Sequence, residues 1–297
     1  MTTPATPATP HAFDLQRLLA HVAGLPRIKV AVVHPCDHDS LLGALAAAAD
    51  GLIEPILVAP AAKLAATAAA AGVALDRFRR VEAPHSHAAA EIAVALARKG
   101  EAAALMKGSL HSDELLQAVM QRDTGLRTER RLSHVFVMEV ERYPRLLAIT
   151  DAAVNIQPTL EEKRDIVQNA IELLRALGIA EPRVAILAAV ETVTSKMQAT
   201  LDAAALCKMA DRGQITGGLL DGPLAFDNAV SLEAAATKGI VSPVAGCADI
   251  LVVPNIEAGN MLAKQLTFLA GADAAGLVVG ARVPIMLTSR ADSVLAR

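Results

Sequence analysis

The residues best suited to chemistry lie near the end of the chain, where an apolar run leads directly into a polar turn. Residues 284–287 have the short apolar pattern of a buried strand, and Ser289, Arg290 and Asp292 follow at once. Polar groups at the carboxyl end of such a strand face the ligand-binding edge of an open α/β sheet. A hydroxyl, a permanent cation and a carboxylate there suit an anionic oxygen that is held while a nearby proton moves.

Two further polar pairs lie where strands or helices are predicted to end or begin. Lys107 and Gly108 follow an apolar run, so an ammonium group and backbone N–H groups are available for a phosphate. A βα turn with a solvated lysine is the alternative. Gly259 and Asn260 lie near a predicted helix start, where free N–H groups bind anions.

The loop His34-Pro35-Cys36-Asp37-His38-Asp39 is rich in residue types that bind metals. No second ligand set with zinc-like spacing follows it, so we predict no metal site. One interpretation is a βα turn in which Asp39 or Ser40 caps the next helix. A loop that handles phosphate or a thiol is the other interpretation.

Strand-like runs alternate with Ala-rich helical runs along most of the chain, which predicts parallel strands joined by crossover helices. The predicted strands are residues 28–34, 53–58, 102–106, 133–140, 145–150, 184–189, 217–220, 250–253 and 284–287. The predicted helices are residues 41–50, 61–71, 87–99, 159–177, 194–210, 228–239 and 258–269.

The short connection at 141–144 predicts an antiparallel hairpin, and this change of pattern marks a second lobe. We therefore predict an α/β fold with a mainly parallel sheet and a cleft between two lobes. The first lobe would comprise residues 28–132 and 276–297, and the second residues 133–275. Residues 1–27 are predicted to be a disordered tail or linker plus a first helix.

Composition excludes several classes of function. Aromatic residues make up 2% of the chain, too few for a surface that stacks single-stranded nucleic acid, and the net charge of −3 attracts no phosphate backbone. No apolar run is long enough to span a membrane. The three cysteines are odd in number and far apart, which favours a reducing compartment. We expect a cytoplasmic protein that binds neither nucleic acid nor membrane.

The polar segments at the strand ends, taken together and in this order, resemble the phosphate acetyl/butyryltransferase family. These segments are residues 105–108, 124–134, 149–155, 220–227, 253–260 and 284–292, and the resemblance runs from residue 28 to the last. It implies that acyl-CoA and inorganic phosphate give acyl phosphate and coenzyme A, with the thioester as substrate and no separate cofactor. It also implies a homodimer and the two-lobed, three-layer α/β/α fold of the isocitrate/isopropylmalate dehydrogenase superfamily.

The resemblance implies roles for particular residues as well. Ser289 and Arg290 would orient the thiol of coenzyme A and stabilise the transition state, and Arg127 would bind phosphate. In acetyltransferase members an Asp seven residues after the serine is the thiol base, but that position is Ala296 here. Asp292 is the nearest carboxylate that is available to replace it. The family also carries a further terminal helix beyond the position at which this sequence stops.

Three functions remain open at this point. Acetyl transfer is our first expectation and butyryl transfer the alternative, because acyl chain length does not follow from the sequence. A dehydrogenase of the same fold would need a metal-binding Asp cluster and a nucleotide loop, and neither an Asp-x-x-x-Asp set with a Lys–Tyr pair nor G-x-G-x-x-G occurs. A non-catalytic sensor of acyl-CoA or phosphate is the third.

Overall fold

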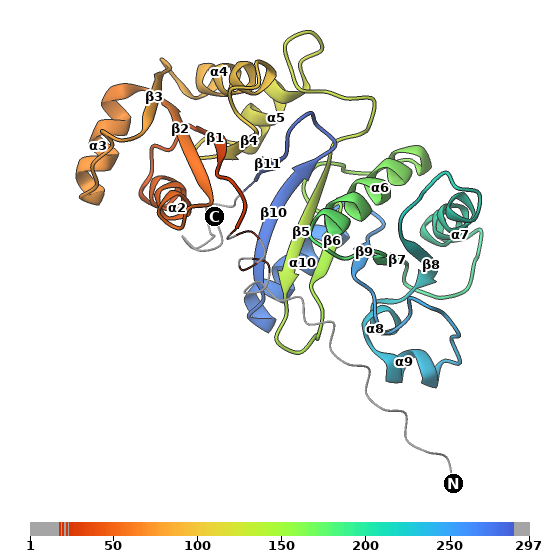
Figure 1. Ribbon diagram of the computed structural model, residues 1–297. Coiled ribbons are helices and arrows are strands. Elements are labelled where there is room, and N and C mark those ends of the chain that lie inside the picture. Colours follow the sequence, from red (N-terminus) through yellow and green to blue (C-terminus); the bar gives the residue numbers. More distant parts are fainter. Residues whose placement is uncertain (1–17, 19, 21, 23, 288–297) are drawn as a thin grey trace.

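The computed structural model describes residues 18, 20, 22 and 24–287. Their strands form one 11-stranded sheet in the order β3-β2-β1-β4-β11-β10-β5-β6-β9-β7-β8 (Figure 1). Most of the predicted tail at 1–27 lies outside the described residues. The predicted α/β class is confirmed.

The first part of the sheet is parallel and follows the predicted alternation of strands and helices. Helices α2 and α3 pack on one face of these strands, and α4 and α5 pack on the other. The strands are β1 (Ile28–Val33), β2 (Ile53–Ala59), β3 (Arg79–Glu82) and β4 (Ala104–Lys107). The helices are α2 (His38–Ala49), α3 (Ala61–Ala71), α4 (Ser86–Arg98) and α5 (Ser112–Met120).

The centre of the sheet contains the antiparallel pairs. Strands β5 (Ser133–Glu139) and β6 (Leu147–Thr150) form the predicted hairpin. Strand β10 (Asp273–Val279) runs antiparallel to β5 on its other side. The short strand β11 (Ile285–Met286) turns back along β10 and pairs in parallel with β4, so the end of the described chain returns to the first strands (Figure 1).

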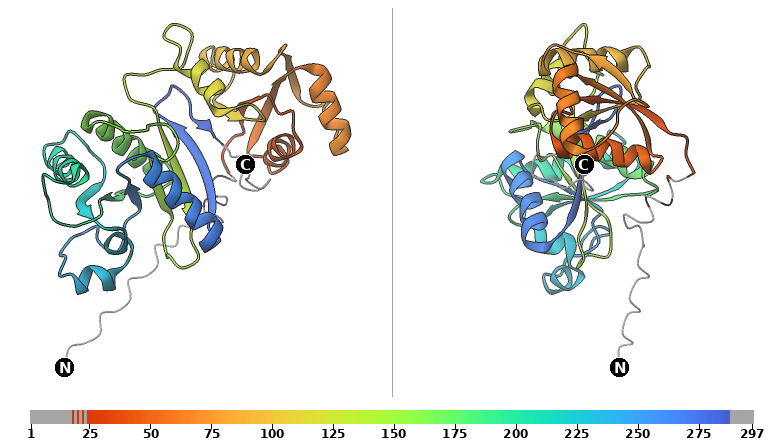
Figure 2. Two further views of the ribbon diagram at one scale, coloured as in Figure 1. Left: turned by 180° about the vertical axis from the view of Figure 1, so that it is seen from behind. Right: turned by 90° about the vertical axis from the view of Figure 1, so that its left-hand side faces the viewer.

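The remaining strands extend the sheet in parallel from β6. They are β9 (Ile250–Val252), β7 (Arg183–Leu187) and β8 (Leu219–Leu224). One face is covered by α6 (Leu160–Ala176) and α7 (Gln198–Asp211), and the other by α8 (Phe226–Val230), α9 (Leu232–Thr237) and α10 (Ile256–Ala270). Helices therefore lie on both faces of the sheet, which gives the predicted three layers (Figure 2).

Helix α6 shows why some boundaries follow from the sequence. Thr159 was expected to begin this helix, and its side chain accepts a hydrogen bond from the Glu162 amide at 3.3 Å. The Glu162 carboxylate accepts in return from the Thr159 amide at 2.9 Å, which completes a capping box.

Other boundaries were predicted wrongly. The single helix expected at 228–239 is two helices, because Ser231 has an extended backbone (φ −126°) and its side chain caps α9. The helix expected from residue 194 begins at Gln198, since Thr194 bonds to the Thr200 side chain in a turn instead. Strand β3, strand β10 and helix α5 have no counterpart among the predicted ranges.

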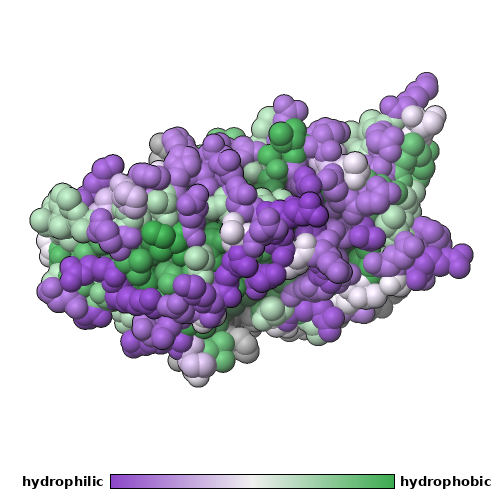
Figure 3. All heavy atoms as spheres, turned by 90° about the horizontal axis from the view of Figure 1, so that it is seen from above, coloured by the Kyte–Doolittle hydropathy of each residue, from purple (hydrophilic) through white to green (hydrophobic). Residues whose placement is uncertain are grey.

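The sheet order groups β1–β4 with β11 and β5–β9 with β10, and β10 and β11 lie side by side where the two groups meet. Strand β10 crosses the expected lobe boundary at residue 276, so the boundaries remain predictions. None of the helices within the described residues is long and apolar enough to cross a membrane. The face seen from above is mainly hydrophilic, with separate small apolar patches (Figure 3).

Candidate active site

The strand order reverses between β1 and β4. From β1 the chain continues to β2 on one side, whereas β4 pairs with β1 on the other. Open α/β sheets bind ligands at the carboxyl ends of strands where the order reverses in this way. Strand β11 lies next to β4, and Met286, Met106 and Val32 are level with one another across the three strands. The carboxyl ends of β1, β4 and β11 therefore meet at one edge, which we call the switch edge.

Lys107 and Gly108 lie at the switch edge. The Lys107 side chain is 4% exposed, and its Nζ is 3.3 Å from the Gly108 carbonyl oxygen. A Cβ atom at Gly108 would lie 2.5 Å from the carbonyl oxygens of Val33 and His34, so only glycine lets β4 end this close to β1. The Gly108 amide donates to Val33 at 2.9 Å. The Gly108 amide is therefore already engaged, and the predicted contact of this pair with phosphate would be made by the Lys107 ammonium group.

His34 and Ser109 are joined at the switch edge by a contact that the sequence did not predict. The Ser109 Oγ atom donates to the His34 carbonyl oxygen at 2.8 Å and lies 3.0 Å from His34 Nδ1. His34 is 9% exposed and has a φ of +54°, which is uncommon for a residue other than glycine. Burial, and then the nearby charge of Lys63, lower the pKa of His34 below its ordinary value. A histidine directly after a strand was the only signal in the sequence.

The rest of this loop is a capped turn. Its cap is Asp37, which accepts from the Ser40 amide at 2.7 Å, so the prediction of Asp39 or Ser40 as the cap is wrong. Burial raises the pKa of the Cys36 thiol to about 11, which keeps it protonated at neutral pH. Within the described part of the chain, no three His, Cys, Asp or Glu side chains are grouped to hold a metal ion.

Arg127 lies on residues 126–132, which lead from α5 to β5 and which we call the crossover. The crossover runs beside residues 280–282. Arg127 forms an antiparallel bridge with Ala281, and the Thr128 hydroxyl donates to the Gly280 carbonyl oxygen at 2.6 Å. Arg127 is exposed, and no hydrogen bond or ion pair engages its guanidinium among the described residues.

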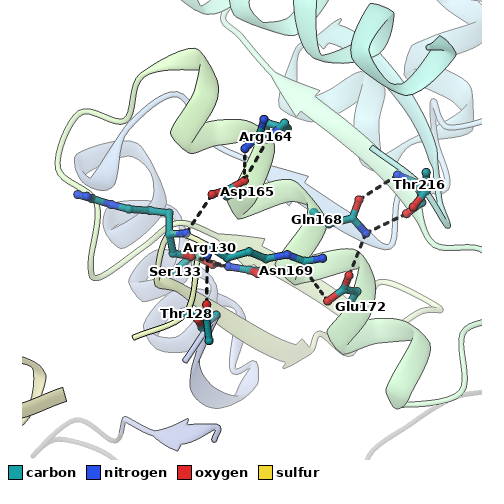
Figure 4. Close-up of polar contacts among 11 residues, drawn as sticks. Thr128, Arg130, Ser133, Arg164, Asp165, Gln168, Asn169, Glu172 and Thr216 are labelled. Carbon is teal, nitrogen blue, oxygen red and sulfur yellow. Dashed lines mark hydrogen bonds and ion pairs between the residues drawn. The ribbon is translucent and has the colours of Figure 1, made fainter. Parts of the chain in front are cut away.

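The neighbouring arginines are held differently, and Figure 4 shows Arg130 beside Glu172. Arg130 pairs with Glu172 of α6 at 2.5 Å. Arg131 donates from Nε to the Asn155 side chain at 2.7 Å and pairs with Glu162 at 3.2 Å. The two are therefore not a solvated run of charges, and they fasten the crossover to α6. Arg127 alone of these three keeps a guanidinium without a partner in the described chain.

Two cavities share the crossover as a wall. The larger, of about 490 Å³, lies between the crossover and α6 and is lined by Arg130, Asn169 and Glu172. The smaller, of about 240 Å³, is lined by Arg127 and Arg131 together with Glu161 and other residues of the first turn of α6. Arg127 thus lines a cavity at the amino terminus of α6, together with the carboxylates of Glu161, Glu162 and Asp165.

Gly259 and Asn260 lie apart from these residues and pack α10 on the turn after β6. The helix begins at Ile256 with Asn255 as its cap, so the pair lies about one turn inside it. A Cβ at Gly259 would lie 2.6 Å from the Asp151 carbonyl oxygen, and the Asn260 side chain donates from Nδ2 to the Ala152 carbonyl oxygen at 3.2 Å. Their role in binding phosphate or coenzyme A stays a prediction.

Asp151 of that turn is a buried acceptor. Its carboxylate accepts from the amides of Ala153 and Val154 at 2.9 Å each and from the Asn155 side chain at 2.5 Å. Burial raises the pKa of Asp151, and these hydrogen bonds oppose the rise. Through Asn155 the turn also holds Arg131 of the crossover. The turn is therefore a structural link between the crossover, β6 and α10.

The predicted catalytic residues Ser289, Arg290 and Asp292, with Ala296, lie outside the described residues. The last described residue is Leu287, whose amide donates to the Gly276 carbonyl oxygen of β10 at 3.0 Å. Strand β11 therefore delivers the chain to the switch edge directly before the predicted pair.

Comparison with known proteins gives consistent results. A sequence family described as phosphate acetyl/butaryl transferase matches residues 85–296. A protein of Rhizobium meliloti named phosphate acetyltransferase is 64% identical over 98% of this chain and 92% of its own length. A phosphate butyryltransferase of Clostridium acetobutylicum is 44% identical over 89% of this chain and 88% of its own.

Solved structures show the same fold. A branched-chain phosphotransacylase from Enterococcus faecalis V583 is similar with a TM-score of 0.80 at 31% identity, covering 91% of this chain and 94% of that one. A 4-hydroxythreonine-4-phosphate dehydrogenase from Klebsiella pneumoniae aligns with a TM-score of 0.55 at 14% identity, over 88% of this chain and 90% of that one. The second likeness concerns the fold alone.

Proposed function

Because the chain belongs to the phosphate acetyl/butaryl transferase family, we propose that it transfers an acetyl group between coenzyme A and inorganic phosphate. The observation that carries this proposal is the 64% identity, over almost the whole chain, to a protein named phosphate acetyltransferase. The meeting of β1, β4 and β11 at one ligand-binding edge supports it, because a transferase must bring two substrates to one place.

The proposed chemistry is an acyl transfer through a tetrahedral oxyanion. Phosphate attacks the thioester carbon, and the C–S bond breaks as coenzyme A leaves. In the proposal Arg290 stabilises the oxyanion and Ser289 orients the thiol, since preorganised donors act where charge develops. Arg127 and Lys107 hold the anionic substrate groups. Their charges, one unpaired and one buried, support that assignment.

The acyl chain is the open part of the proposal. A relative named phosphate butyryltransferase at 44% identity keeps butyryl transfer as the second candidate. Acetyl-, propionyl- and butyryl-CoA should therefore be compared at saturating phosphate. We expect the highest kcat/KM for acetyl-CoA, and a higher value for butyryl-CoA would replace the acetyl assignment.

Release of free thiol from acetyl-CoA is the test of the reaction class. We expect release that depends on added phosphate and yields acetyl phosphate in equal amount. Reduction of NAD without thiol release would indicate a dehydrogenase instead. Binding of acetyl-CoA without turnover would indicate a sensor.

Self-association is part of the proposal. Helix α10 exposes Met261 (65%), Phe268 (70%) and Leu269 (81%), and large apolar side chains grouped on one helix favour a protein interface. We propose that this helix contributes to a homodimer. Sedimentation should give a dimer mass that falls to the monomer mass in a Phe268→Ser, Leu269→Ser double variant. A monomeric parent chain would contradict it.

The proposal includes no separate cofactor and a cytoplasmic location. Cys36, Cys207 and Cys247 are free thiols, which supports a reducing compartment. Full phosphate-dependent thiol release by protein dialysed against a chelator would agree with the first point, and fractionation of cells would test the second.

A further inference from the structure

The His34–Ser109 contact supports one tautomer of His34 in particular. Ser109 Oγ lies 2.8 Å from the His34 carbonyl oxygen and 3.0 Å from His34 Nδ1, and a serine hydroxyl has one hydrogen. When that hydrogen goes to the carbonyl oxygen, Ser109 Oγ accepts from Nδ1, and Nδ1 holds the ring hydrogen. The neutral ring then has its lone pair on Nε2, the arrangement that a general base requires.

No described residue forms a hydrogen bond with the Nε2 atom of His34. Nε2 is also absent from the fully buried, unpartnered side-chain nitrogens and oxygens of the described residues, which are His134 Nδ1 and Asn228 Oδ1. Within the described part of the chain, nothing therefore competes with a substrate for this nitrogen, in a residue that is 9% exposed.

The backbone around His34 is built for this placement. The φ of +54° holds the residue in a region that non-glycine residues seldom adopt, and such outliers collect at functional sites. Gly108 leaves room for the His34 carbonyl oxygen, and the Cys36 amide donates to the same Ser109 Oγ at 3.3 Å. Three backbone features thus hold one side chain at the switch edge.

His34 also directly follows β1, a strand close to β11. Strands β1 and β11 both pair with β4, so they are about 10 Å apart, at two strand spacings. A thiol bound at the switch edge would therefore lie near the end of β1, which His34 directly follows. Ala296 occupies the position where the family resemblance puts its base, so the sequence offers Asp292 as a replacement, and His34 is a second candidate.

We infer that His34 Nε2 removes the proton from the thiol of coenzyme A when acyl phosphate is the acyl donor, an inference that rests on the proposed function. The S–H proton moves to Nε2 and the sulfur attacks the acyl carbon. The C–O bond to phosphate breaks, phosphate leaves with the electron pair, and His34 returns the proton to it. Cys36 does not compete for this role, since its own thiol stays protonated.

The charges around His34 suit a base at neutral pH. Burial lowers the pKa of His34 most, and the charge of Lys63 on α3 lowers it further. Glu114 of α5 and Asp37, which lies in the same turn as His34, raise the pKa. Lys107 at the end of β4 is a further buried cation at this edge. The net result is a pKa below 6.5, so the ring is neutral near pH 7 and ready to accept a proton.

His34→Asn is the variant that isolates this role. Asparagine tolerates a positive φ, and its side-chain amide can donate to Ser109 as Nδ1 does, but it has no Nε2 lone pair. We expect kcat with acetyl phosphate and coenzyme A to fall about a hundredfold or more. Added imidazole should restore part of it. The remaining rate should rise about tenfold per pH unit until the thiol of coenzyme A is deprotonated. His38→Asn, four residues away on an exposed side chain, is the matched control and should match the parent.

The outcomes separate the inference from the proposed function. An inactive parent chain would end both. Two results would overturn the inference alone. One is an active parent with an equally active His34→Asn variant. The other is a large defect in Asp292→Asn that a higher pH repairs, while His34→Asn is normal. If His34→Asn fails to fold, the parent decides: kcat/KM must show an acid limb with a pKa below 6.5, and its absence overturns the inference.

Discussion

The end of β1 and the start of β5 each hold a buried histidine, and the two are built in opposite ways. His34 Nδ1 contacts the Ser109 hydroxyl at 3.0 Å, and no described residue bonds to its Nε2. His134 is 1% exposed, its Nδ1 has no partner among the described residues, and its ring packs edge-on against Phe136 with centroids 4.4 Å apart. Burial lowers the pKa of both rings, so a lowered pKa alone does not make a site. The difference lies in the hydroxyl contact at one nitrogen of His34 and in the position of this residue at the switch edge.

The largest expected effect tests the role proposed for Arg290, which follows β11 in the sequence. Arg290→Ala should lower turnover about a hundredfold or more, because a charged donor to the oxyanion is lost. Arg290→Lys should recover only part, since a point charge does not reproduce the planar fork. Initial rates of thiol release measure both, and parent-like turnover in Arg290→Ala would contradict the proposed role.

The second prediction concerns the opposite histidine. Burial lowers the pKa of His134 to about 4, whereas an unfolded chain has a value near 6.5. Between these values the unfolded state binds more protons, so stability must fall as pH falls from 6.5 to 4. The loss approaches about 3 kcal/mol below pH 4. His134→Leu should flatten this slope in urea unfolding at several pH values and leave activity at pH 7 intact.

A slope that persists in His134→Leu would show that other groups cause the acid sensitivity. His38→Asn is the control, because this exposed side chain should leave the slope unchanged. An activity loss in His134→Leu without a stability change would give His134 a role at the site. It would then not be the structural counterpart of His34.

The third prediction uses the glycine beside each histidine. A Cβ at Gly108 would lie 2.5 Å from the His34 carbonyl oxygen, and one at Gly276 would lie 2.8 Å from His134 Nε2 and 2.7 Å from the Leu287 carbonyl oxygen. Either alanine variant should lose about 1–3 kcal/mol of stability by overpacking. Gly24→Ala, with nothing within 4 Å, should lose none of this.

Activity then separates the two glycines. Gly108→Ala displaces the His34 carbonyl oxygen, which lies 2.8 Å from Ser109 Oγ, so the contact that supports the proposed tautomer is lost and kcat should fall beyond the effect of instability. The measurement is kcat per folded molecule for Gly108→Ala and the parent, at a low temperature where instability matters least. Equal specific activity in Gly108→Ala and the parent would mean that the contact does not matter for catalysis.

Much of the fold followed from local patterns in the sequence. The alternation of apolar strands with Ala-rich helices, the hairpin around 141–144 and the capping box at Thr159 are all short-range signals. Strand β3 gave no such signal, because its sequence Arg-Arg-Val-Glu carries three charges and no buried residue. The break at Ser231 was missed because helix propensity is similar on both sides of it.

The candidate site was predictable in part for the same reason. Lys107 was found because it directly follows a strand, which is visible in the sequence. The His34–Ser109 contact joins residues 75 positions apart and depends on β4 lying next to β1, which alternation alone does not specify. The packing roles of Gly259 and Gly108 depend on distances between backbones, so they also needed the structure.

The smallest expected effect separates a binding arginine from a structural one on the same segment. Arg127 has no partner in the described chain, whereas Arg130 pairs with Glu172 at 2.5 Å. Arg127→Ala should raise the KM for phosphate about tenfold, more than the KM for acetyl-CoA, with unchanged stability.

Arg130→Ala should leave both KM values unchanged and cost at most about 1 kcal/mol of stability, because this ion pair is largely exposed. An equal rise of both KM values in Arg127→Ala would point to displacement of the whole crossover. The same rise in Arg130→Ala would identify that displacement as the cause, since Arg130 fastens the crossover to α6.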